Sequence, residues 1–255
     1  MKITLLPSSL GADADWSLQY LTSFLIDDAL AIDAGCLGFF RTAREQARIK
    51  HVLLSHSHMD HIASLPIFLE NVYGGPSVVT VHASEWVLNC LQSDLFNDRI
   101  WPDFIGLSRK GEALLNTAVL TPLVPVQLGG LTITPVPVDH VVPTFGFLVE
   151  DATTAVAISS DTGPTEEIWR RANALPNLKA VFLEVAFPNA MAGLAAQAKH
   201  HTPRSFGEEM RKLRLPIPVF AYHIKAHFRE QVVKELHELG LPNLMIAQAE
   251  RPYLF

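Results

Sequence analysis

Cysteine is scarce in this chain, which has only Cys36 and Cys90 among its 255 residues. Two cysteines in a chain of this length exclude a disulfide framework, and they form no Cys-x-x-Cys pair, so we expect two buried thiols rather than metal ligands. The chain also lacks an apolar run of about 18 residues, so no membrane-spanning helix is expected. The apolar run at residues 3–6 is too short for a secretory signal, and we therefore predict a cytoplasmic protein.

An excess of basic charge is also missing. Lys and Arg together number 20 against 26 Asp and Glu, and the net charge is −6. Proteins that grip long nucleic acids usually carry a basic footprint, so this balance favours a small anionic substrate over a nucleic-acid polymer. With 49% hydrophobic residues, residues 1–255 suit one large domain or two fused halves. Whether the protein forms a homodimer is left open by the sequence.

Short runs rich in Val, Ile, Leu and Phe predict eleven strands. They are residues 3–6, 23–26, 29–33, 52–55, 78–82, 131–138, 145–149, 155–159, 180–185, 219–222 and 244–247. Start and stop signals, such as Thr202 before Pro203 and Gly240, predict six helices. They are residues 39–49, 64–72, 84–94, 165–173, 203–213 and 228–239. Two groups of strands with helices between them predict an α/β fold, a four-layer αββα sandwich.

The segment 93–130 fits neither pattern well, because it holds several Pro and Gly residues besides Phe96, Trp101 and Phe104. Long irregular segments often serve as functional lids. We therefore expect a lid or substrate-binding segment there.

Histidine and aspartate are concentrated in the segment His56-Ser57-His58-Met59-Asp60-His61, directly after a strand-like run. Imidazole and carboxylate are the ligands that suit zinc and similar divalent ions. A strand that stops at such a cluster delivers these side chains to one rim of a sheet. The segment therefore predicts a metal site.

Three further donors each follow a predicted strand: His140, Asp161 and His223. Together with His56, His58, Asp60 and His61 they make seven candidate ligands. Seven are too many for one tetrahedral ion and suit two. Two such ions can hold a hydroxide between them and clamp a phosphoryl or acyl oxygen. Zinc is favoured by the imidazoles, although manganese and iron fill similar sites.

The pattern H-x-H-x-D-H resembles the metal-binding signature of the metallo-β-lactamase fold. The resemblance implies that His56, His58 and His140 hold one ion. It implies that Asp60, His61 and His223 hold the other, with Asp161 bridging the two.

Longer stretches resemble the class II cyclic-nucleotide phosphodiesterases of that fold. They are residues 22–35, 96–103, 160–164, 184–189, 201–203 and 222–225. The resemblance implies hydrolysis of a 3′,5′-cyclic nucleotide, cAMP or cGMP, to the 5′-nucleotide by a metal-bridging hydroxide. Asp60 then counts as a catalytic residue as well as a ligand.

Other residues receive roles in this reaction. His201 is our expected proton donor for the leaving oxygen, with the adjacent His200 as the alternative, and Glu184 would orient His201 or a ligand imidazole. Lys225 would reach the phosphate. Stacking on a purine base is expected from three aromatic side chains, Phe96, Trp101 and Phe104.

Three alternatives stay open. The first is a nuclease of the RNase Z kind, which usually carries a basic substrate arm that this acidic chain lacks. The second is a thioester hydrolase or lactonase of the glyoxalase II kind, whose neutral substrates would not need Lys225. The third is a redox diiron protein or a non-catalytic member, although a non-catalytic member should lack some of the seven donors.

Overall fold

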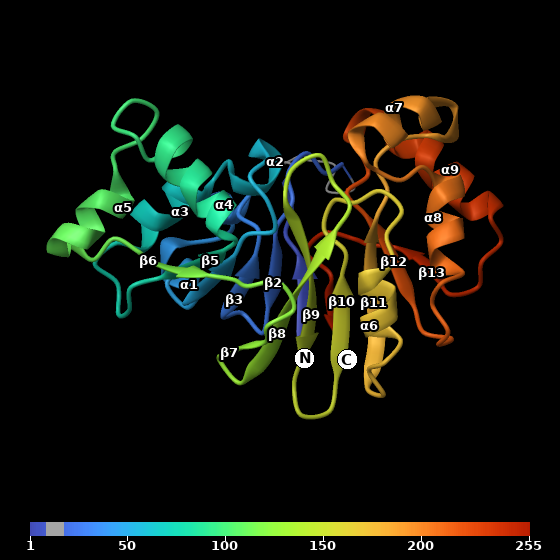
Figure 1. The fold of residues 1–255 in the computed structure, drawn as a ribbon, viewed down its shortest axis with the longest axis horizontal. Helices are drawn as coiled ribbons and strands as arrows, with labels where there is room; N and C mark the ends of the chain where they lie inside the picture. The colour runs from blue at the N-terminus through green and yellow to red at the C-terminus, as the bar shows by residue number, and fades with distance from the viewer. Residues whose placement is uncertain (9–17) are drawn as a thin grey trace. The chain divides into compact units, whose positions relative to one another are not determined.

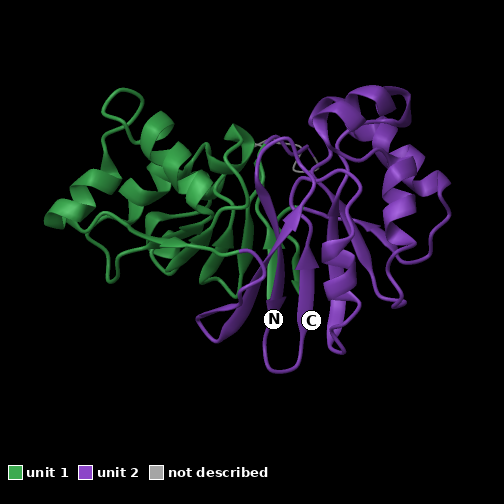
Figure 2. Ribbon diagram, in the orientation of Figure 1, with its two compact units in different colours: residues 1–10, 21–121, 249–254 green, residues 11–20, 122–248, 255 purple. Residues whose placement is uncertain are grey.

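The computed structural model describes residues 1–8 and 18–255 of the chain. The chain divides into two compact units (Figures 1 and 2). Unit 1 consists of residues 1–10, 21–121 and 249–254, and unit 2 consists of residues 11–20, 122–248 and 255. That residues 1–255 act as one domain stays a prediction.

Unit 1 is built on a seven-stranded mixed sheet in the order β14-β1-β2-β3-β4-β5-β6. The strands are β1 (Lys2–Leu5), β2 (Phe24–Ile26), β3 (Leu30–Ile32), β4 (His51–Leu53), β5 (Thr80–Ala83), β6 (Asn116–Val119) and β14 (Pro252–Leu254). Strands β14, β1, β2 and β3 pair antiparallel, whereas β3, β4, β5 and β6 pair parallel. The carboxyl ends of the parallel strands therefore meet at one rim.

The helices of unit 1 pack on one face of its sheet. They are α1 (Ala43–Gln46), α2 (Met59–Ile62), α3 (Leu65–Val72), α4 (Glu85–Cys90) and α5 (Phe104–Leu107), with shorter helical turns at Leu37–Phe39, Leu91–Leu95 and Ser108–Glu112. Phe68 of α3 and Val87 of α4 share a buried core with Val52 and Val81 of the sheet. Burial of such side chains stabilises the unit by about 1.5–3 kcal/mol each.

Unit 2 repeats this plan with a second seven-stranded sheet, in the order β13-β12-β11-β10-β9-β8-β7. The strands are β7 (Val126–Leu128), β8 (Leu131–Val138), β9 (Thr144–Glu150), β10 (Ala155–Ile158), β11 (Leu178–Glu184), β12 (Val219–Tyr222) and β13 (Leu244–Ile246). Strands β7 to β10 pair antiparallel and β10 to β13 pair parallel. The parallel strands again end at a common rim.

Within the described residues of unit 2, four helices accompany the second sheet. They are α6 (Glu167–Ala172), α7 (Ala192–Ala198), α8 (Pro203–Met210) and α9 (Arg229–Glu238), with 3-10 turns at Asn189–Met191 and Ala226–Phe228. Trp169, Phe206 and Leu236 bring α6, α8 and α9 into one core with the strand residues Val181 and Val219. Among the described helices, none has the length and apolar character to cross a membrane.

All eleven predicted strands are present to within about two residues, but the sequence reading missed β6, β7 and β14. Strand β6 is largely exposed, and β14 begins with Pro252, so neither shows the apolar pattern of a strand. The segment 93–130, expected to be irregular, contains α5, β6 and β7. Its role as a lid stays a prediction.

The helix predicted at residues 39–49 is wrong in extent, because only Ala43–Gln46 is α-helical. Arg41 has a φ of 53°, which interrupts a right-handed helix. Thr42 then caps α1 in a capping box with Glu45. The other predicted helix signals are confirmed: Thr202 caps α8, and Gly240 follows α9 with a φ of 61°.

Candidate metal centre

In unit 1, the predicted donor loop follows β4 directly, as expected for a site on the rim of a sheet. The chain leaves the sheet after Leu53, passes His56 and His58, and enters α2, which carries Asp60 and His61. The ring centroids of His56 and His58 are 4.7 Å apart, and those of His56 and His61 are 4.2 Å apart. The three imidazoles therefore form one cluster.

A single carboxylate, Asp33, fixes two of these imidazoles. Asp33 is buried after β3, and its Oδ2 accepts a hydrogen bond from Nδ1 of His61 at 2.7 Å. The Ser55 hydroxyl donates its only proton to the same carboxylate at 2.8 Å. The Ser55 oxygen, 2.9 Å from Nδ1 of His56, must then accept from that nitrogen. Both rings thus carry the proton on Nδ1, which leaves Nε2 as the nitrogen with a lone pair.

The backbone of the donor loop is held as tightly as its side chains. Thr22 N–H donates to the Asp60 carbonyl at 2.8 Å, and Ala34 N–H donates to the His61 carbonyl at 2.7 Å. Gly35 lies beneath this contact, where an added Cβ would come within 2.1 Å of the Asp60 carbonyl oxygen. Glycine at residue 35 therefore permits α2 to approach β3 and its following loop.

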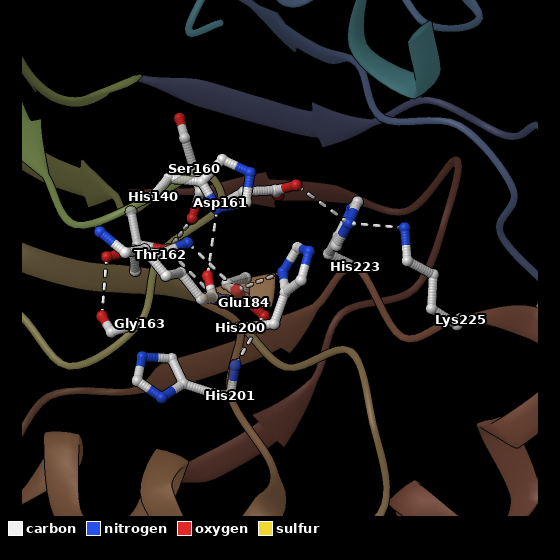
Figure 3. A network of polar contacts seen from close by, with 12 residues as sticks. His140, Ser160, Asp161, Thr162, Gly163, Glu184, His200, His201, His223 and Lys225 are labelled. Atoms are coloured by element: carbon white, nitrogen blue, oxygen red, sulfur yellow. Dashed lines mark hydrogen bonds and ion pairs between the residues drawn. The ribbon is translucent and has the colours of Figure 1, made fainter. Parts of the chain in front are cut away.

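In unit 2, the three remaining donors lie at three separate strand ends, as predicted: His140 after β8, Asp161 after β10 and His223 after β12. Nε2 of His223 lies 3.3 Å from Oδ2 of Asp161 (Figure 3). Nδ1 of His140 donates to the Lys199 carbonyl at 3.1 Å. His223 has a φ of 62°, an uncommon conformation that persists only where surrounding structure enforces it.

These contacts fit the chemistry of a metal site. Metal-binding imidazoles usually donate one ring N–H to a protein oxygen, which fixes the tautomer and directs the other nitrogen at the ion. His56, His61 and His140 each commit Nδ1 in this way, to a hydroxyl, a carboxylate and a carbonyl. The donor set therefore suits divalent ions that accept imidazole and carboxylate ligands.

A second carboxylate, Glu184, organises unit 2. Its side chain is fully buried and accepts hydrogen bonds from Nδ1 of His200 at 2.8 Å and from Thr162 N–H at 3.1 Å (Figure 3). The His200 ring centroid lies 5.0 Å from that of His140 and 5.6 Å from that of His223. Burial raises the pKa of Glu184. Burial opposes the charged form of His200, but the adjacent Glu184 carboxylate, with a smaller contribution from Asp161, outweighs burial and raises the pKa of that imidazole.

The sequence profile described as the beta-lactamase superfamily domain matches residues 26–224, which is well over half of the chain. The chain belongs to the beta-lactamase superfamily. A probable 3′,5′-cyclic-nucleotide phosphodiesterase of Yersinia pestis is 27% identical to it over 96% of the chain and 80% of that protein.

Two solved structures share the fold of this beta-lactamase superfamily member. Unliganded yeast PDE1 has a TM-score of 0.79 at 17% identity, covering 100% of this chain and 99% of the other. The metallo-β-lactamase fold protein YhfI from Bacillus subtilis has a TM-score of 0.73 at 17% identity, covering 99% and 98%. The predicted α/β sandwich of the metallo-β-lactamase type is confirmed, and the chain is a hydrolase of that fold.

Within this superfamily site, the structure does not support His201 as the proton donor. Its side chain is fully buried, with Nδ1 3.1 Å from the Ser205 hydroxyl at the start of α8. Burial, with smaller contributions from His200 and Lys212, lowers the pKa of His201 to about 3, so the ring is neutral near pH 7. Glu184 contacts the imidazole of His200 but only the backbone N–H of His201.

Two of the three aromatic residues expected to stack on a base are part of the core of unit 1. Phe96 and Phe104 are buried, and their rings stack on each other with centroids 5.5 Å apart. Stacking on a substrate would require opening that core, and base stacking by these two residues stays a prediction. Trp101 is half-buried and packs against the same core.

Lys225 lies beside a candidate ligand, and its predicted contact with the phosphate stays a prediction. Its Nζ is 3.2 Å from Nε2 of His223 (Figure 3). The sequence analysis did not identify Asp33, although a carboxylate at the end of a predicted strand was a usable signal. It named His200 only as the alternative to His201. The contact of His200 with Glu184 joins residues 16 positions apart, and sequence spacing does not reveal such a contact.

Proposed function

We propose that this beta-lactamase superfamily hydrolase binds two divalent metal ions and hydrolyses a 3′,5′-cyclic nucleotide to the 5′-nucleotide. The observation that carries the proposal is the match to a probable 3′,5′-cyclic-nucleotide phosphodiesterase over 96% of the chain. The acidic net charge of −6 supports a small substrate rather than a nucleic-acid polymer. On the sequence alone we propose a cytoplasmic location and leave the homodimer open.

We assign the seven donors to two ions, with Asp161 shared. His56, His58 and His140 would hold one ion, and Asp60, His61 and His223 the other. The imidazole-rich set favours zinc, although manganese and iron suit similar donors. Ions bound there would lower the pKa of a coordinated water to about 7 and polarise a phosphoryl oxygen.

The protein's own side chains would bind the substrate and move the proton. Lys225 would place its ammonium group near the phosphoryl oxygens, since it already lies beside His223. In forming the 5′-nucleotide, the bond between phosphorus and the 3′-oxygen breaks, and that oxygen needs a proton. We assign this proton to Nε2 of His200, because Glu184 holds Nδ1 and sets the direction of the ring.

The direct test is release of 5′-AMP from 3′,5′-cyclic AMP by the purified protein supplied with zinc or manganese, with a chelator as control. The proposal expects turnover that the chelator abolishes and that His58→Ala removes. His237→Ala is the matched control, because His237 is exposed on α9. Two bound metals without turnover of cAMP or cGMP would contradict the substrate and direct attention to other phosphodiesters, then to thioesters and lactones.

A further inference from the structure

Lys199 ends α7 in a backbone conformation that is unusual for a residue with a long side chain. Its φ is 53° and its ψ is 58°, in the left-handed region where glycine commonly ends a helix. A Cβ is disfavoured in this region, whereas glycine would adopt it without strain. Such strain concentrates where function requires it, so the lysine side chain at residue 199 needs an explanation.

The carbonyl group of Lys199 contacts a proposed metal ligand. Its oxygen accepts a hydrogen bond from Nδ1 of the buried His140 at 3.1 Å. A protein oxygen in this position fixes the tautomer and the orientation of a ligand imidazole. The direction of the His140 ring therefore depends on a backbone carbonyl that belongs to the strained end of α7.

The side chain of Lys199 holds the residue directly before this ligand. Its Nζ lies 2.6 Å from Oδ1 of Asp139, and the two side chains are 39% and 51% exposed, so water and salt reach the ion pair. Lys199 thus contacts the segment 139–140 twice, with its ammonium group at Asp139 and with its carbonyl at His140.

The contacts of Asp139 extend to the loop that carries a second proposed ligand, Asp161. The Asp139 carbonyl accepts a hydrogen bond from Gly163 N–H at 2.7 Å, and Asp139 N–H donates to the Thr162 hydroxyl at 3.2 Å. A Cβ added to Gly163 would lie 3.5 Å from Cα of Lys199, which is ordinary van der Waals contact. Direct contacts therefore join the segments that follow β8 and β10 to the end of α7.

We propose that Lys199 is a positioning residue for the metal ion assigned to His140, because its ion pair with Asp139 fixes the segment that presents this ligand. Exposed ion pairs contribute little to stability, so the ligand beside the pair explains it better than the fold does. A ligand that is already held in its binding orientation loses less freedom when the ion binds, which raises the affinity. The inference rests on the metal site of the proposed function but not on its substrate.

The test compares Lys199→Met with Lys199→Gly, since both variants remove the ion pair and only glycine relieves the backbone. Zinc titration against a competing chelator should show one of the two sites weakened about tenfold in both, as is common when the support of a ligand imidazole is lost. Metal-free Lys199→Gly should unfold at a temperature no lower than the wild type, because glycine suits this conformation. Weaker zinc binding in that variant would therefore report positioning and not loss of the fold.

The charge of Lys199 has two readouts of its own. Lys199→Arg keeps the charge and should retain the wild-type zinc affinity. The difference between Lys199→Met and the wild type should shrink in about 1 M salt, where the Debye length falls to about 3 Å and the exposed ion pair is screened. Lys234→Met is the matched control, because it removes another exposed lysine that pairs with a carboxylate, Glu238. It should leave both zinc affinities unchanged.

The outcomes separate this inference from the proposed function. If the wild type binds two ions and Lys199→Met and Lys199→Gly bind them equally well, the inference alone is overturned. A loss in Lys199→Arg as large as that in Lys199→Met would also overturn it, because the charge would then not matter. Wild-type protein that binds no zinc would overturn the proposed metal site and the inference together.

Discussion

The two units supply their candidate donors in opposite ways. Unit 1 places four donors within six residues, His56 to His61, so that one loop and one short helix position them all. Unit 2 takes one donor from each of three strand ends, at His140, Asp161 and His223. A compact sequence motif therefore identifies the first set, whereas the second emerges only when the strands are known.

The supporting carboxylates of the two units, Asp33 and Glu184, also differ in what they contact. Asp33 is hydrogen-bonded to His61 and, through Ser55, to His56, so it supports two proposed ligands. Glu184 supports His200, which is not a proposed ligand. The comparison separates a carboxylate that orients two of the proposed metal ligands from one that orients the proposed proton donor.

The largest effect should come from removing a donor from either unit. His58→Ala and Asp161→Ala should each lower kcat/KM by more than about 1,000-fold and reduce the metal content, since bound ions supply several kcal/mol of transition-state stabilisation. Metal analysis and turnover of cAMP measure both quantities, with His237→Ala as the control. A fully active Asp161→Ala variant would contradict two ions that share this carboxylate.

The second effect distinguishes the two supporting carboxylates. Glu184→Gln should lower kcat by about 100-fold or more with metal content retained, because a positioned proton donor contributes 10²–10⁴-fold. Asp33→Asn should instead weaken metal affinity by about 10–100-fold, as loss of a partner to a ligand imidazole commonly does. Metal titration beside steady-state kinetics measures both. If Glu184→Gln lost metal and Asp33→Asn did not, the comparison would be reversed.

A smaller effect concerns the backbone of the donor loop. Gly35→Ala would force its Cβ against the Asp60 carbonyl and should lower the free energy of unfolding by about 1–3 kcal/mol. Gly193 in α7 has no atom within 4 Å of an added Cβ. Gly193→Ala should therefore stabilise the protein by about 0.5–1 kcal/mol. Chemical denaturation tests the pair, and equal effects from both would contradict close packing at residue 35.

A further effect depends on pH and concerns the buried His201 ring. The pKa of His201 is about 3 in the folded protein, against about 6.5 when unfolded. Between these two pKa values the unfolded chain binds more protons than the folded protein. His201 therefore lowers the free energy of unfolding by up to about 1.4 kcal/mol for each pH unit by which the pH falls through that window.

His201→Gln should make stability less sensitive to pH between about 6 and 4. Denaturation of the metal-free protein at several pH values measures the slope, with His237→Ala expected to match the wild type. An unchanged slope in His201→Gln would mean that this ring takes up a proton in the folded protein.

The sequence was most informative where local pattern and burial coincide. Runs such as residues 131–138 and 219–222 are apolar because they are buried strands, and the structure places β8 and β12 there. The sequence did not predict β6, because its side chains are mostly exposed and it is held by pairing with β5. A strand that is held mainly by pairing with a distant segment has no apolar pattern in its own sequence.

The same limit applies to the site. The positions of His140, Asp161 and His223 at strand ends were predictable, because each residue closely follows an apolar strand-like run in the sequence. The pairing of Glu184 with His200 rather than with the His201 ring depends on which of two adjacent imidazoles turns toward the carboxylate. Phe96 and Phe104 suit a base-stacking role by residue type, but residue type does not reveal that both side chains are buried in the core of unit 1.

The return of the chain to its first sheet has a consequence for folding. Strand β14 pairs antiparallel with β1, with Lys2 opposite Leu254, after every described strand of unit 2 has been traversed. During synthesis, β1 therefore lacks this neighbour until residues 252–254 have left the ribosome. Contacts between such distant segments form slowly, and an unpaired strand edge is prone to aggregate meanwhile. The nascent chain should therefore expose the edge of β1 until residues 252–254 emerge.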